Sequence, residues 1–208
     1  MNISNNSFTL RDYLAFVFPG ILLIGAYLLI YNEHWELIKQ DKLLAGVVLL
    51  VGSYFLGYMS SVLSSRTLTK LIYWLVGDSF RTLLSEPEKN KFDTDFSDVL
   101  KEKLETYWGK KLSNSSESNL LYLCWRDIQT TDHKGMEYQF RLVSLWNFCE
   151  SVLIPSLILS IIFAAQYNFM LSIISLSMFI LMAISMIEKR KEFGKNVYKI
   201  WYVINKNV

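Results

Sequence analysis

Few residues in this sequence have the type and the spacing that catalysis needs. His34 and His133 lie far apart along the chain, and no HExxH, GxSxG, P-loop or glycine-rich dinucleotide motif is present. Cys124 and Cys149 form neither a CxxC metal knuckle nor a disulfide framework, so we interpret both as packing residues. These spacings favour a protein that is not an enzyme.

Asp93, Asp95 and Asp98 form an acidic cluster that could hold a metal ion. They also stand at the beginning of a predicted helix, where the helix macrodipole favours negatively charged side chains. We prefer this second interpretation. We expect neither a metal ion nor a cofactor in this protein.

A polar triplet, Arg141, Asn147 and Glu150, immediately precedes the third long apolar segment of the chain. Asn147 and Glu150 are three positions apart, so they share one face of a helix. An ionisable group at membrane depth is a functional candidate by default, although a carboxylate at headgroup level is inexpensive. We interpret the triplet as a polar coupling point at the membrane edge.

Four charge-free apolar segments could position these residues in a membrane, and the first, second and fourth are long enough to cross it alone. A bilayer core about 30 Å thick takes about 20 helical residues, and the third segment needs a backward extension through residues 141–150 or a thinner bilayer. Hydrophobic residues make up 52 % of the chain and charged residues 19 %, against about 25 % charge in soluble domains. The sequence predicts an all-α integral membrane protein with four transmembrane helices, at Tyr13–Tyr31, Leu43–Leu63, Ser151–Gln166 and Phe169–Ile187.

The charge pattern gives these segments a predicted orientation. The loop at residues 32–42 carries two lysines against three acidic residues, whereas lysines and arginines crowd the exits of the second and fourth segments. The positive-inside rule therefore places both termini and the long middle segment in the cytoplasm. The predicted parts are an N-terminal transmembrane hairpin at 1–63, a helical insert at 64–150, a C-terminal transmembrane hairpin at 151–187 and a basic amphipathic tail at 188–208.

The insert and the tail read as amphipathic helices. Apolar residues recur at helical spacing from Phe92 to Trp108, and a second such stretch runs from Asn119 to Gln129. In the tail, Val197, Ile200, Trp201 and Ile204 are interleaved with Lys195 and Lys199, which predicts a helix lying in the anionic inner interface of the membrane.

Small residues and prolines mark the apolar segments. The row Ser53, Gly57, Ser61 and Ser65 repeats every four residues, and such a row lets a second helix approach closely, within one chain or in a homo-oligomer. Pro19 and Pro155 interrupt two otherwise apolar segments, where we expect helix kinks.

The layout resembles a group of small bacterial inner-membrane proteins found in anti-phage defence islands. The residues that carry the resemblance are the element Phe18-Pro19-Gly20, Tyr54 with Gly57 and the trailing serines, and Arg141 with Asn147 before a closing hairpin. The group includes the Kiwa membrane subunit and the transmembrane effectors of such systems. The resemblance implies a membrane sensor or a membrane-disrupting effector, and it brings no catalytic residues with it.

The function hypothesis is a non-enzymatic inner-membrane component of a defence system. It would contact the lipid bilayer, form a homo-oligomer, and receive a cytoplasmic protein partner or a small nucleotide ligand through the insert, without binding nucleic acid directly. One alternative is a constitutive small channel or transporter subunit. A second alternative is a membrane-embedded enzyme acting on lipid or peptide, to which only Glu150 and Arg141 could contribute.

Overall fold

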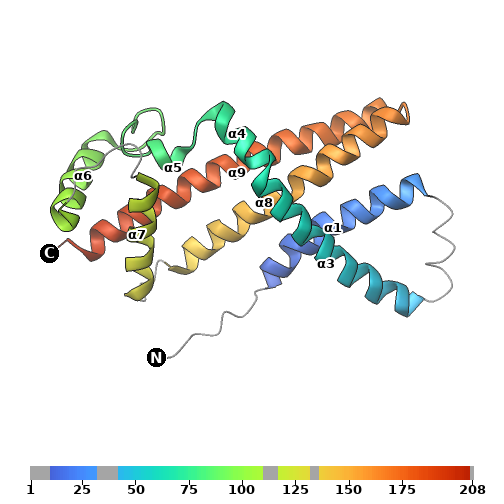
Figure 1. Cartoon of the computed structure of the whole chain (residues 1–208), viewed down its shortest axis with the longest axis horizontal. Coiled ribbons are helices and arrows are strands. Elements are labelled where there is room, and N and C mark those ends of the chain that lie inside the picture. The colour runs from blue at the N-terminus through green and yellow to red at the C-terminus, as the bar shows by residue number, and fades with distance from the viewer. Residues whose placement is uncertain (1–9, 32–41, 110–116, 132–135, 207–208) are drawn as a thin grey trace. The chain divides into compact units, whose positions relative to one another are not determined.

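The computed structural model describes residues 10–31, 42–109, 117–131 and 136–206, and every regular element within these ranges is an α-helix (Figure 1). The predicted all-α class is therefore confirmed over the described part of the chain. The helices are α1 (Leu10–Ile30), α3 (Lys42–Arg66), α4 (Leu68–Val76), α5 (Ser79–Thr82), α6 (Thr94–Trp108), α7 (Glu117–Thr130), α8 (Met136–Ala165) and α9 (Phe169–Ile204).

Three helical stretches are long and apolar enough to cross a bilayer. They are Ala45–Val76, which joins α3 to α4, and the whole of α8 and of α9, whereas the described apolar part of α1, Ala15–Ile30, is shorter. The long α8 supplies the backward extension that the third predicted segment needs, because it begins at Met136. The structure thus indicates a membrane protein with three candidate spans.

The chain divides into two compact units. The apolar unit comprises the described residues of Met1–Ile72 and Ser144–Met186, and the polar unit comprises those of Tyr73–Val143 and Ile187–Val208. Large apolar side chains of the apolar unit point outward, with Phe55 61 % exposed and Ile173 63 % exposed. An apolar surface of this kind needs an apolar covering such as lipid.

Two glycines allow the backbones of α1 and α3 to touch within the apolar unit (Figure 1). A Cβ atom added to Gly57 would lie 1.7 Å from the carbonyl oxygen of Phe16, and one added to Gly20 would lie 1.7 Å from that of Ser53. The ring of Phe16 packs edge-on against Tyr54, with 5.8 Å between the ring centroids. Only glycine fits at these two crossing points.

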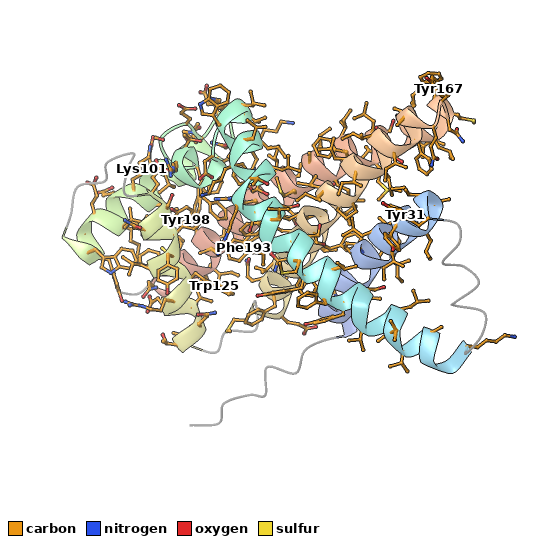
Figure 2. All side chains as sticks on the ribbon, turned by 45° about the vertical axis from the view of Figure 1, so that its right-hand side comes forward. Tyr31, Lys101, Trp125, Tyr167, Phe193 and Tyr198 are labelled. Carbon is orange, nitrogen blue, oxygen red and sulfur yellow. The ribbon has the colours of Figure 1, made fainter. Side chains whose placement is uncertain are left out.

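The core of the polar unit joins four helices. Asp93 caps the N-terminus of α6 by accepting a hydrogen bond from the Phe96 N–H, and Gly109 ends the helix at φ 61°, where glycine is favoured. The ring of Phe193 meets that of Trp125 with 5.3 Å between the centroids (Figure 2). The fully or almost fully buried core residues include Leu83, Leu84, Leu100, Leu104, Leu121, Cys124, Ile128, Leu142, Val197, Tyr198 and Trp201.

The C-terminal segment differs from the interfacial helix that the sequence predicts. It is the continuation of α9, a single helix of 36 residues, and belongs to the same compact unit as the insert. Val197 and Trp201 have no exposed surface because they pack inside the polar unit. An amphipathic pattern shows that one face of a helix needs an apolar partner, but lipid and a protein core satisfy that need equally.

We predict that Gly57→Ala will destabilise the apolar unit by about 3 kcal/mol, because the new methyl group meets a backbone oxygen that cannot move aside. The measurement is thermal or SDS-induced unfolding of the purified protein in detergent micelles.

The matched control is Gly46→Ala on the same helix, where an added Cβ has no atom within 4 Å. This change should leave stability equal or raise it by up to about 1 kcal/mol through helix propensity. Equal stability of the two variants would contradict the close crossing of α1 and α3.

Candidate functional site

Pro19 removes one hydrogen bond from α1, and a neighbouring helix replaces it. Proline has no N–H, so the carbonyl of Ala15, four residues earlier, loses its helical donor. The hydroxyl of Ser151 on α8 lies 2.9 Å from this carbonyl oxygen and donates to it, while it also lies 2.8 Å from the carbonyl oxygen of Phe148. The freed carbonyl of α1 is therefore satisfied without water.

Pro155 on α8 creates the same need, and α3 meets it. The carbonyl that Pro155 leaves without its helical donor belongs to Ser151, and the Ser60 hydroxyl donates to it across 2.9 Å. Ser60 is 3 % exposed and Ser151 has no exposed surface. A relay of two serines thus joins α3 to α8 and α8 to α1, and we call it the proline–serine relay.

The small-residue row of α3 follows a slightly different face from the predicted one. Ser53 and Gly57 lie against α1, as described above, but Ser61 is half-buried and Ser65 is exposed and donates to Val62 of its own helix. The buried positions further along are Ser60 and Ser64. Repeated steps of four residues drift around a helix with 3.6 residues per turn, so a single step of three, from Gly57 to Ser60, keeps the buried row on one face.

Glu150 is a buried carboxyl group of the apolar unit, with 6 % of its surface exposed. The hydroxyl of Thr69 on α4 donates a hydrogen bond to Glu150 Oε1 across 2.7 Å, and the sulfur of Met186 on α9 lies 3.7 Å from the same hydroxyl oxygen. Three helices therefore meet at one polar contact between apolar segments. A buried carboxyl in such a place marks a functional candidate.

The structure separates the other members of the predicted triplet by environment. Arg141 is exposed and belongs to the polar unit, and Asn147 is half-buried in the apolar unit. Of the three, Glu150 alone is buried. Pro19 and Pro155, the two predicted kink positions, lie inside continuous helices.

The side chain of Arg190 makes contacts in the polar unit that the sequence did not predict. The guanidinium carbon of Arg190 lies 4.1 Å from the ring centroids of both Tyr73 and Phe80, and its Nη2 lies 3.1 Å from Asp78 Oδ1. Such contacts are worth about 0.5–2 kcal/mol each when the cation is partly desolvated. Arg190 thus acts as a structural anchor of α9 within the polar unit.

Glu117 is a buried carboxylate at the first residue of α7, two positions before the stretch at Asn119–Gln129 that the sequence predicts to be helical. Its two carboxylate oxygens accept hydrogen bonds from the N–H groups of Leu84 and Ser85, across 3.0 Å and 2.9 Å. Burial raises the pKa of the Glu117 carboxyl above its ordinary value, and these hydrogen bonds oppose the rise. The Glu117 carboxylate joins α7 to the turn that follows α5. This structural role accounts for its burial without a catalytic role.

The described residues contain no group of three or more His, Cys, Asp or Glu side chains placed to hold a metal ion. His34 and His133 lie outside the described residues. Burial raises the pKa of the Cys124 thiol well above its ordinary value, so this thiol is not a reactive thiolate at neutral pH. Asp93 serves as the N-cap of α6.

Comparisons of this chain with protein-family models, with curated proteins and with solved structures give no match.

The proline–serine relay makes a prediction about two residues together. Ser151→Ala should lower the free energy of unfolding by about 1 kcal/mol, a typical value for a hydrogen bond between membrane helices. In a Pro19→Ala background the same change should have a much smaller effect, because residue 19 then supplies the N–H that the Ala15 carbonyl lacks. A double-mutant cycle on protein in detergent micelles measures this difference.

The Thr69–Glu150 contact makes a second prediction. Thr69→Val keeps the volume of the side chain but removes one hydrogen bond to a buried carboxyl, so it should destabilise the protein by about 1–3 kcal/mol. Thr67→Val is the matched control, since Thr67 is exposed, lies between α3 and α4, and its hydroxyl donates to the Leu63 carbonyl oxygen four residues earlier. Unfolding midpoints that fall equally in both variants would contradict a special role for Thr69.

Proposed function

We propose that this protein is a non-enzymatic inner-membrane component of a bacterial anti-phage defence system. In this proposal α1, α3, α8 and α9 cross the bilayer, which makes four spans, and the polar unit lies in the cytoplasm with both termini. The positive charges after the second and fourth segments and the three candidate spans support this arrangement.

One observation carries the proposal: α9 belongs to both units. Its apolar first part, Phe169 to Met186, lies in the apolar unit, and its later residues Val197, Tyr198 and Trp201 are fully buried in the core of the polar unit. The same unbroken helix therefore serves as a candidate span and as a core element. A change in the polar unit's core has to involve α9.

The proposed mechanism follows from this sharing. A cytoplasmic protein partner or a small ligand binds the polar unit and favours one packing of its core over another. Because α9 and α8 continue into the apolar unit, the rearrangement reaches the helices that contact lipid. The outcome is a report of infection at the membrane or, in the effector version, a bundle that opens and depolarises the cell. The exposed apolar faces of α3 and α9 would contact lipid or further copies of the chain.

A constitutive channel or transporter subunit is a second candidate, and Glu150 favours it. A carboxyl group buried among apolar helices beside Thr69 is a common element of ion pathways. Ion flux through liposomes that contain only the purified protein would support this candidate against the defence proposal.

The defence proposal predicts that interrupting α9 between the units abolishes function. Four glycines inserted between Met186 and Ile187 should remove protection from phage in cells that carry the protein with its neighbouring genes, because the helix can no longer pass a change along. Plaque counts measure protection, and a potential-sensitive dye measures depolarisation.

The same insertion after Gln166, in the turn between α8 and α9, is the matched control and should keep protection. Cysteines at Tyr167 and Lys89, both exposed, check the topology of each variant. An impermeant thiol reagent should label position 167 in intact spheroplasts and position 89 only after permeabilisation. Full protection by the Met186–Ile187 insertion variant would contradict the proposal, and an intact potential during triggered growth arrest would leave the sensor version alone.

A further inference from the structure

A cavity of about 290 Å³ opens in the polar unit between the end of α6 and the middle of α7. Pockets that bind small molecules measure about 300–1,000 Å³, so this one has room for a single ring system with a substituent. The residues that line it are Tyr107, Trp108, Leu123, Arg126, Asp127 and Thr130.

The aromatic wall of the cavity is held in place from behind. The Trp108 ring stacks on Trp201 of α9 with 5.3 Å between centroids, and Tyr107 meets the same ring edge-on at 5.2 Å. Trp201 is fully buried, and its Nε1 donates a hydrogen bond of 2.9 Å to Asp127 Oδ2. A preorganised aromatic surface of this kind is suited to stacking against a planar ring.

Arg126 and Asp127 give the cavity one positive and one negative charge, and both can form further hydrogen bonds. Arg126 is exposed and forms no ion pair with any residue that the structure describes. Asp127 Oδ2 accepts from Trp201 and from Asn205, whereas Oδ1 accepts no hydrogen bond from the described residues. A complementary ligand therefore combines a planar ring, hydrogen-bond donors and an anionic group.

We propose that this cavity binds a nucleotide. The base would stack on the aromatic wall, its donor groups would meet Asp127, and the phosphate would pair with Arg126, whose guanidinium suits phosphate oxygens. The volume admits one nucleotide base and excludes an enclosed dinucleotide. Leu123 is the one aliphatic residue among those that line the cavity, so a lipid chain fits poorly.

The nucleotide site specifies the class of ligand that the proposed function requires. The effect of nucleotide binding on the membrane rests on that proposed function. In the proposal Trp108 contacts the bound base, and in the structure the same ring stacks on Trp201. Trp201 belongs to α9, the helix shared by both units. Binding therefore acts on the element that the mechanism requires to move.

The test is isothermal titration calorimetry of the full chain in detergent micelles with AMP, GMP, CMP and UMP. Ribose 5-phosphate and inorganic phosphate serve as probes without a base, and a short oligonucleotide tests whether the nucleotide of a strand binds in place of a free one. At least one mononucleotide should bind saturably and more tightly than either probe without a base. Arg126→Gln should weaken that binding about tenfold or more.

Arg81→Gln is the matched control, because Arg81 is an exposed arginine of the same unit that does not line the cavity. Its affinity for nucleotide should equal that of the unchanged protein. No binding at about 1 mM nucleotide, equal affinity for phosphate alone, or unchanged affinity in Arg126→Gln would each overturn the inference. Tighter binding of the oligonucleotide would overturn the free nucleotide as the ligand.

The two proposals fail in different ways. If nucleotide does not bind but the glycine insertion between Met186 and Ile187 still abolishes protection, the site is wrong and the function stands. If nucleotide binds and that insertion leaves protection intact, the site stands and the proposed coupling through α9 is wrong.

Discussion

Backbone carbonyl groups among apolar helices need donors, and two prolines in this protein each remove one. In water, solvent would donate the missing hydrogen bond to the carbonyl oxygen. In apolar surroundings the protein itself must supply that donor. Serine hydroxyls supply both missing donors, from Ser151 to the Ala15 carbonyl and from Ser60 to the Ser151 carbonyl. Each hydroxyl comes from a different helix than the carbonyl it satisfies. The two prolines therefore favour particular neighbours for α1 and α8, and a particular axial register between them. The glycine contacts between α1 and α3 are compatible with the same packing.

The two units use buried polar groups in different ways. In the apolar unit Glu150 receives a hydrogen bond from Thr69, so a carboxyl group sits where apolar contacts prevail. In the polar unit Glu117 and Arg190 join elements far apart in the chain, the first through backbone N–H groups and the second through two aromatic rings and Asp78. Loss of one partner from such a contact costs the hydrogen-bond or cation–π energy that this partner supplied. These positions therefore join segments that are distant in the chain within each unit.

Local signals allowed the sequence to predict much of the fold. Asp93 and Gly109 mark the ends of α6, and the apolar segments lie within long helices. Several periodic apolar residues of the insert, such as Leu100 and Leu104, are buried in its core, whereas Val99 and Tyr107 are exposed. The sequence also predicted that Pro19 and Pro155 interrupt apolar segments. It could not show which serine hydroxyls donate to the freed carbonyl oxygens, because that depends on how distant segments pack. The row at Ser53 and Gly57 was visible, and its continuation through Ser60 required the true helical period. The apolar face at Val197 and Trp201 was visible too, but periodicity cannot tell lipid from protein as its partner.

The position of Trp201 in the chain has a consequence for biogenesis. The middle segment at 73–143 leaves the ribosome well before the residues of α9 that complete its core. Between these two events the apolar segments of α8 and α9 must be synthesised and, in the proposed topology, enter the membrane. Until then the nascent middle segment exposes apolar residues such as Leu100 and Leu121 that the finished protein buries. In the proposed topology, membrane insertion of α8 and α9 thus precedes completion of the polar unit's core, and a chain that stalls before α9 is a natural target for chaperones and proteases.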